Sequence, residues 1–140
     1  SAQVIPSLAA MSIWKGVGYN MIIFFAGLQA IDPTYYEAAK MDGANRWHLF
    51  RHITLPLLKP TSLVVFIMAV IGSFQVFTQV YMMTNGGPGY ASRVIGLEIY
   101  QTAFMNLKMG LASAMAMLLF VIIFALTMLQ LRIGGSAVEY

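Results

Sequence analysis

Few side chains in this sequence could do chemistry, and most of those that could lie between Asp32 and Pro60. This stretch holds more than half of the charged residues and both histidines. His48 and His52 are four residues apart, a spacing at which two imidazoles on one helix can share a metal ion. The sequence offers no third ligand and no glutamate next to His48, whereas zinc sites take three or four protein ligands. We therefore expect no metal, and contact of both rings with a headgroup or a protein surface.

A second polar group interrupts an otherwise apolar stretch from 73 to 81. Two glutamines one helical turn apart should face other helices rather than lipid, where their amides would lack hydrogen-bond partners. Amides, hydroxyls and aromatic rings suit a polyol, so the cluster predicts a solute path. The alternative is hydrogen bonding that only fixes helix packing, at about 0.6 kcal/mol on average, and the sequence leaves both open. The path candidates are Ser73, Gln75, Phe77, Gln79 and Tyr81.

The sequence argues against an enzyme. Its long apolar runs contain no carboxylate and no histidine, and so no acid–base pair. No GxxxxGK(S/T) stretch occurs, which excludes ATP binding by a phosphate loop, and without cysteine no thiolate site is possible. We expect no catalytic residue, no metal and no cofactor bound by this chain.

The composition places these groups in a membrane protein. The chain has 140 residues, of which 59% are hydrophobic and 9% charged, and its mean hydropathy is +0.75. Soluble domains carry about 25% charged residues, and apolar runs of about 20 residues can cross a bilayer as helices. We predict an all-α transmembrane bundle. Its parts are a span at about 8–31, a loop at 32–60, a span at 61–83, an extracytoplasmic loop and helix at 84–108, a span at 109–131 and a tail at 132–140.

Basic residues predict which way the chain crosses the membrane. The 32–60 loop holds four of them, and Arg132 follows the last span on the same side, while Lys15, Arg93 and Lys108 fall on the other. Short loops rich in lysine and arginine stay in the cytoplasm, so we place this loop there and the N-terminus outside. Lys15 is the only charge before Asp32. We expect it near one end of the first span, where it can snorkel or sit inside a bundle.

Local signals predict two short helices in the 32–60 loop. The proline before Thr34 suits a first helical turn, and Thr34 with Glu37 matches a capping box, so a helix should follow at about 35–41. Gly43 permits the left-handed conformation that ends a helix. A second short helix should lie beyond this glycine, and Pro56 should prevent its continuation.

The same loop resembles the EAA motif of ABC importer permeases. That motif runs glutamate-alanine-alanine, three residues, glycine, nine residues, isoleucine, one residue, leucine-proline. Every position is met by Glu37-Ala38-Ala39, Gly43, Ile53 and Leu55-Pro56. The closing LPLLKP is most similar to the carbohydrate-uptake branch of that family, and the similarity continues through NGGP at 85–88 and GLASA at 110–114. The chain therefore resembles the C-terminal half of such a permease, and its opening inside an apolar run fits a piece of a longer protein.

The resemblance implies a mechanical role for the loop. Permeases of this family carry no ATPase, and a short helix of the loop docks on a separate ATP-binding subunit. A glutamate there would accept charge-assisted hydrogen bonds, and aromatic rings would anchor the interface. The simpler alternative is that Glu37 only caps its helix with Thr34 and that the aromatic rings lie on the membrane surface. The coupling residues implied are Glu37, Ala38, Ala39, Asp42, Gly43, Trp47, Phe50, Arg51 and Pro56.

The resemblance also implies partners and a location. The chain would be a permease subunit of a binding-protein-dependent importer for a sugar or related polyol, multi-pass in a bacterial or archaeal inner membrane. Its partners would be a second permease, two ATP-binding subunits that hold ATP and Mg²⁺, an extracytoplasmic solute-binding protein and membrane lipid, with no nucleic acid. The glycine-rich loop at 86–89 could meet the binding protein, although a plain chain reversal needs nothing more. The competing hypothesis is a membrane interaction or assembly protein that recruits a cytosolic partner and moves no solute.

Overall fold

The computed structural model describes residues 3–135, and within them the chain is helical with no strand. This confirms the predicted all-α class. Residues 136–140, which end the predicted tail, lie outside the described residues. The α-helices are α1 Val4–Gln29, α2 Pro33–Met41, α3 Arg46–Leu49, α4 Leu55–Leu57, α5 Lys59–Phe74, α6 Thr78–Met83, α7 Ile95–Tyr100 and α8 Met109–Gly135, and two π-helical turns are η1 Phe50–Thr54 and η2 Gln101–Met105.

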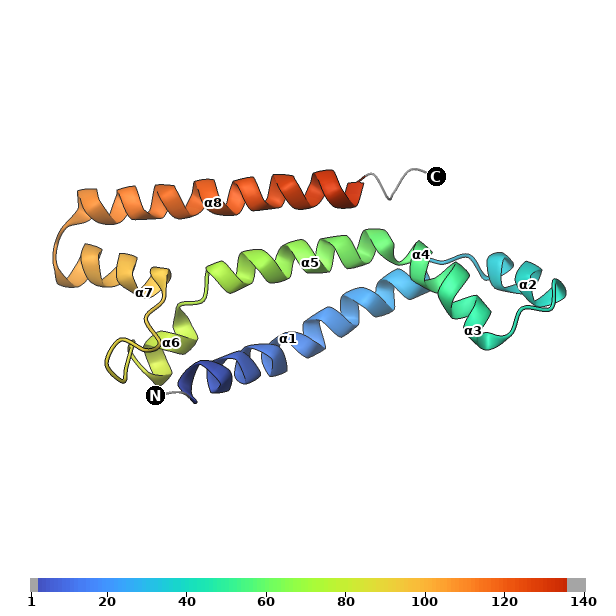
Figure 1. Ribbon diagram of the computed structural model, residues 1–140, viewed down its shortest axis with the longest axis horizontal. Coiled ribbons are helices and arrows are strands. Elements are labelled where there is room, and N and C mark those ends of the chain that lie inside the picture. The colour runs from blue at the N-terminus through green and yellow to red at the C-terminus, as the bar shows by residue number, and fades with distance from the viewer. Residues whose placement is uncertain (1–2, 136–140) are drawn as a thin grey trace.

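Three long helices lie side by side, with α5 between α1 and α8 (Figure 1). The short helices occupy opposite ends of this layer. At one end α2, α3 and α4 extend beyond α1 and α5, and we call residues 32–58 the elbow. At the other end α6 and α7 follow an interruption after α5, and we call residues 75–108 the break end. Arg132 lies in the last turn of α8, which returns toward the elbow, so the predicted basic residues share one end.

Among residues 3–135, two helices are long and apolar enough to cross a membrane, and they are α1 and α8. They contain most of the predicted spans 8–31 and 109–131. A third crossing would take Arg46–Leu57 and Lys59–Phe74 together, and these two stretches meet at an angle of 59°.

The predicted span 61–83 is not one helix, because α5 ends at Phe74 and α6 begins at Thr78. The backbone of Phe77 has φ −134° and ψ −60°, outside the α-helical region. No proline or glycine stands at 75–77 to announce the interruption. A neighbouring element explains it better, because a Cβ built on Gly96 of α7 would lie 3.2 Å from the carbonyl oxygen of Val76. The start of α7 therefore packs directly on the broken backbone.

Lys15 lies in the middle of its helix, and the expectation that it lies near one end is wrong. α1 begins at Val4 rather than near residue 8, so Lys15 lies eleven positions after Val4 and fourteen positions before Gln29. The uncharged residues from Val4 onward also belong to this helix, although the predicted span began only near residue 8.

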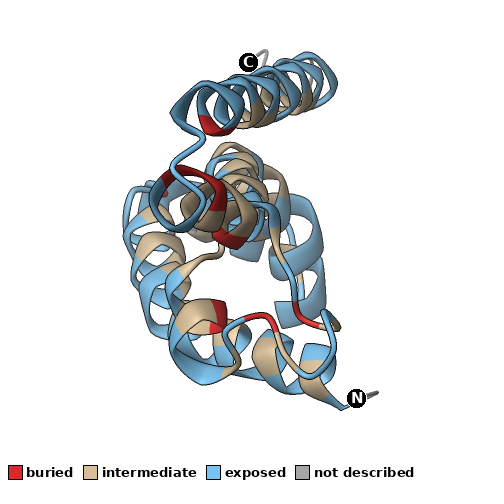
Figure 2. Ribbon diagram, turned by 90° about the vertical axis from the view of Figure 1, so that its left-hand side faces the viewer, coloured by how far each residue is buried: buried red, intermediate tan, exposed pale blue. Residues whose placement is uncertain are grey.

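Most of the buried residues belong to the break end or the start of α8, the end that faces the viewer in Figure 2, and Ile31 and Val65 are buried outside it. Leu97 is 0% exposed and Val80 is 1% exposed, and Thr102, Ala103 and Ala112 are also buried, whereas α1 has no buried residue. The outer faces of α1 and α8 are lined with large apolar side chains. Such faces suit lipid or further transmembrane helices. Toward the elbow, α1 and α5 cross closely, since a Cβ on Gly27 would lie 2.6 Å from Oγ1 of Thr61.

Candidate functional site

Asp32, and not Thr34, caps helix α2. The Asp32 carboxylate accepts a 2.9 Å hydrogen bond from the backbone N–H of Thr34 and a 2.8 Å bond from its hydroxyl. These two bonds stabilise the ionised carboxylate and hold the pKa of Asp32 below its ordinary value of 3.8, and the bond from the backbone N–H has the larger effect. The predicted capping box of Thr34 and Glu37 is therefore wrong, because the Thr34 hydroxyl is already directed to Asp32. Glu37 is exposed and is not needed for the cap.

The end of α2 explains the spacing between alanine and glycine in the motif. The N–H of Ala44 bonds to the carbonyl of Ala39 at 3.0 Å, and the N–H of Gly43 bonds to that of Lys40 at 3.1 Å. This pair of bonds is a Schellman motif, which needs a left-handed residue after the helix. Gly43 has φ +81° and supplies it, as predicted. The glycine must stand four residues after Ala39 for both bonds to form.

A side-chain hydrogen bond links the two arms of the elbow. The hydroxyls of Tyr36 on α2 and Thr54 on η1 lie 2.9 Å apart, so one donates to the other. Pro56 lies within α4 rather than ending the helical stretch, which differs from the prediction. A proline lacks the N–H and crowds the preceding turn. The wider π-helical turn directly before it accommodates both effects, and the chain bends only after Leu57.

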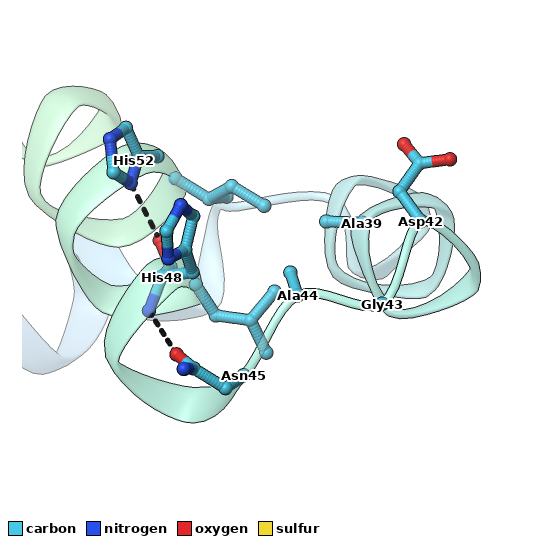
Figure 3. Close-up of a pocket in the computed structure, with 9 residues that line it drawn as sticks. Ala39, Asp42, Gly43, Ala44, Asn45, His48 and His52 are labelled. Carbon is cyan, nitrogen blue, oxygen red and sulfur yellow. Dashed lines mark hydrogen bonds between the residues drawn. The ribbon is translucent and has the colours of Figure 1, made fainter.

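A cleft of about 470 Å³ separates the end of α2 from α3 and η1 (Figure 3). Ala39 and Ala44 line it on the α2 side, and His48 and His52 line the other wall. The two imidazoles stack with centroids 4.6 Å apart, and Nδ1 of His52 lies 3.2 Å from the carbonyl oxygen of His48. Within residues 3–135 no group of three or more histidine, cysteine, aspartate or glutamate side chains could hold a metal ion.

The predicted coupling residues fall together on the elbow and most are accessible. Trp47 is 66% exposed and Phe50 is 46% exposed, and their rings are 5.9 Å apart. Such a pair of uncovered aromatic rings fits either a protein partner or a membrane surface. The exposed members of the set are Glu37, Ala38, Asp42, Gly43, Trp47, Phe50 and Arg51, while Ala39 and Pro56 are partly covered.

The break end brings four aromatic rings together. Phe77 and Tyr81 stack at 5.3 Å, and Tyr100 lies 5.2 Å from Phe77 and 5.4 Å from Tyr81. Phe104 extends the group at 5.3 Å from Tyr100. Phe77 and Tyr81 were predicted as path residues, but Tyr100 and Phe104 were missed as site residues. Both residues come about twenty positions after Phe77 and Tyr81 in the sequence. The only sequence signal that relates them to each other is their spacing of four residues, which suits one face of a helix.

The interruption between α5 and α6 divides the predicted polar path residues. Gln79 accepts a 2.6 Å hydrogen bond from the hydroxyl of Ser12 on α1, which the sequence did not indicate. Ser73 donates to the carbonyl of Ala69 at 2.8 Å, inside its own helix, and Gln75 is exposed where α5 ends. The amide of Gln79 therefore joins α6 to α1, and the amide of Gln75 remains exposed at the break.

The loop after α6 is tightly held. The hydroxyls of Thr84 and Ser92 lie 2.7 Å apart, and Ser92 also donates to the carbonyl of Gly87 at 2.7 Å. Arg93 pairs with Glu98 at 2.7 Å and donates to Gln101 at 3.0 Å. The glycine-rich segment is thus an ordered loop with internal hydrogen bonds, and whether it contacts a binding protein or only reverses the chain stays open.

Comparison with known proteins identifies relatives along nearly the whole chain. Residues 2–135 match the family described as binding-protein-dependent transport system inner membrane component. A probable ABC transporter permease protein, YurN of Bacillus subtilis, is 40% identical over 133 residues, which are 95% of this chain and 46% of the relative. The sn-glycerol-3-phosphate transport system permease protein UgpA of Agrobacterium fabrum is 36% identical over 139 residues, 99% of this chain and 47% of UgpA. The trehalose/maltose transport system permease protein MalF of Thermococcus litoralis is 38% identical over 129 residues, 91% and 43% of the two chains.

Proposed function

This chain belongs to the family of binding-protein-dependent transport system inner membrane components, and from that membership we propose that it forms part of a permease subunit of an ABC importer for a sugar or related polyol. The chain spans less than half the length of the relatives compared above. The relatives are transport permeases, two of them named for a polyol phosphate and for disaccharides. We infer that this chain contributes helices and a coupling elbow and catalyses no covalent step.

The accessibility of Glu37 is the observation that carries the proposal. The cap of α2 uses Asp32, and the end of α2 uses the backbone of Ala39 to Ala44, so the local structure holds together without the Glu37 carboxylate. A glutamate that its own helix does not need can accept charge-assisted hydrogen bonds from a partner. The alternative in which Glu37 only caps the helix loses its main support.

The elbow is also built to transmit force. The 2.9 Å bond between Tyr36 and Thr54 ties α2 to η1, and the η1–α4 stretch continues into α5 after one bend of 59°. A displacement of α2 by a docked ATP-binding subunit would therefore pass to α5, and from α5 to the break. We propose that ATP and Mg²⁺ are held by two such subunits, and that this chain binds neither.

The break end suits the solute and the outer partners. Four aromatic rings and the exposed amide of Gln75 offer stacking faces and hydrogen bonds of the kind that a polyol uses. A second permease subunit would cover the apolar faces of α1 and α8 and complete the path between the two subunits. The loop closed by Thr84 and Ser92 is the part we propose to face the extracytoplasmic solute-binding protein.

Charge reversal at Glu37 tests the proposal. In the complete transporter, Glu37→Lys should reduce co-purification of the ATP-binding subunits and ATP-driven uptake by at least about tenfold, as expected when a charged hydrogen bond is replaced by repulsion. Glu37→Gln, which keeps a neutral acceptor, should fall between Glu37→Lys and the native protein. If the chain is instead a membrane interaction protein that moves no solute, Glu37→Lys would reduce co-purification of the partner, and the native protein would show no uptake. Unchanged co-purification and uptake for Glu37→Lys would refute the docking role.

A further inference from the structure

A lone charge lies in the middle of the α1 span. α1 rises about 1.5 Å per residue, which puts Lys15 roughly 16 Å from Val4 and roughly 21 Å from Gln29. The hydrocarbon core of a bilayer is about 30 Å thick, so a centred α1 holds Lys15 within a few ångströms of the midplane. Lysines snorkel to the interface from near helix ends, and this one is near neither.

No group in the described part of the chain neutralises this lysine. Among residues 3–135, Lys15 has no ion pair and no side-chain hydrogen bond, and its side chain is exposed. The acidic residues between 3 and 135 lie in the elbow or at Glu98, which pairs with Arg93. A charged side chain at this depth needs water or an electronegative partner. That partner must come from outside these residues.

The position of Lys15 on the helix places it beside the break. Ser12 bonds to Gln79 of α6, so the Ser12 face of α1 looks toward α6. At 3.6 residues per turn, Lys15 is about 60° around the helix from Ser12, and Val17 is about 200° around from Lys15. Lys15 thus borders the face of α1 that bonds to Gln79, about one helical turn beyond Ser12, while Val17 points to the far side.

We propose that Lys15 is a specificity-determining residue of the solute path, whose ammonium group donates hydrogen bonds to oxygen atoms of the solute. The inference rests on the proposed transport function and adds a charged donor to the uncharged groups described at the break. A polyol supplies such oxygens as hydroxyls, and a polyol phosphate or sugar acid supplies them as acid oxygens. A positive charge at this point would also repel cationic solutes from the path.

Cysteine labelling tests the location without relying on transport. These 140 residues contain no cysteine, so Lys15→Cys and Val17→Cys each add a single thiol to them, and the test uses the complete complex with every other part made cysteine-free. A membrane-impermeant methanethiosulfonate reagent should label position 15 at least ten times faster than position 17. Equal, slow labelling at both positions would place Lys15 in lipid or in a dry interface, and would overturn the inference.

Uptake tests the specificity. In proteoliposomes with saturating loaded binding protein, Lys15→Gln should lower solute moved per ATP hydrolysed by about tenfold or more, the loss expected for a charged hydrogen bond. Lys15→Arg should retain most of the transport, and Arg132→Gln, in the last turn of α8, should match the native protein. A neutral disaccharide and a polyol phosphate serve as probes, and a loss confined to one of them identifies hydroxyl or acid oxygens as the acceptor.

The remaining outcomes separate the inference from the proposed function. Native uptake for Lys15→Gln with both probes would overturn the inference and leave the importer function intact. Loss of complex assembly on Lys15→Gln with normal transport by the assembled fraction would assign the lysine to a protein partner, which also overturns it. If the native complex moves neither probe, the proposed solute class fails, and the labelling rates still decide whether Lys15 lines a watery path.

Discussion

The elbow and the break end are built by different means. In the elbow, the Asp32 cap and the Gly43 Schellman motif join residues two to five positions apart, and most side chains remain exposed. At the break end, Ser12 meets Gln79 across 67 positions, and Leu97 and Val80 are buried. The elbow is held mainly by short-range hydrogen bonds with one longer link between Tyr36 and Thr54, whereas the break end adds contacts among distant segments.

This difference suits the two tasks proposed for them. A docking element must keep its shape while its surface is free for a partner, and short-range hydrogen bonds such as the Asp32 cap and the Schellman motif hold the shape while most side chains stay exposed. A region that changes exposure during transport needs several packed elements that can exchange contacts. The two ends should therefore respond differently to mutation, with single positions deciding the elbow and shared packing deciding the break end.

The largest effect is expected at Gly43. Gly43→Leu places a side chain at φ +81°, which costs about 1–2 kcal/mol and favours unwinding of the turn, although nothing lies within 4 Å of a Cβ there. We expect ATP-driven uptake to fall about tenfold while the protein still inserts and assembles its helices. Uptake and co-purification of the ATP-binding subunits measure the effect.

Gly43→Asn is the matched control, because asparagine tolerates the left-handed region far better than leucine. It should keep most of the uptake. Equal loss in Gly43→Asn and Gly43→Leu would mean that the glycine is needed for close approach of the partner, and that backbone conformation does not decide the elbow.

A smaller effect, spread over several contacts, is expected at Tyr100. Tyr100→Ala removes ring contacts with Phe77, Tyr81 and Phe104, each aromatic pair being worth about 0.5–1.5 kcal/mol. Because Tyr100 is only half-buried, we expect a net loss near 1 kcal/mol. Hydrogen exchange should then quicken in α6 and α7, with α2 unaffected. Tyr100→Phe should restore native exchange, and faster exchange in α2 would show that the two ends are coupled in stability.

The elbow was predictable from the sequence to the extent that local signals define it. The positions of α2 and of the turn at Gly43 follow from proline, glycine and the motif spacing, which act within a few residues. The cap was misassigned because Asp32 and Thr34 are both good N-caps, and only the observed hydrogen bonds decide between them. The link between Tyr36 and Thr54 has no sequence signal at all.

The break end was predictable in composition but not in geometry. The glutamines and aromatic residues of 73–81 indicated a polar region, yet the uncharged run favoured one continuous helix. The interruption depends on the close approach of α7 at Gly96, a contact between distant segments that periodicity cannot show. For the same reason Ser12, Tyr100 and Phe104 entered the site only with the fold.

The smallest effect, and the most local one, is expected at Asp32. Its folded-state pKa is lowered by the two bonds from Thr34, so the cap stabilises α2 fully above the ordinary value of 3.8 and is lost as pH falls through the lower folded value. Asp32→Asn keeps an acceptor of similar capping strength, so α2 should be nearly unchanged at neutral pH. Amide exchange at Thr34 and Tyr35, followed from pH 6 downward, should show an acid transition in the native protein that Asp32→Asn lacks. Thr34→Val, which keeps the backbone bond and removes the hydroxyl bond, should move this transition to higher pH without abolishing it. An acid transition that persists in Asp32→Asn would assign the titration to another group, and the start of the elbow would then depend on more than its own cap.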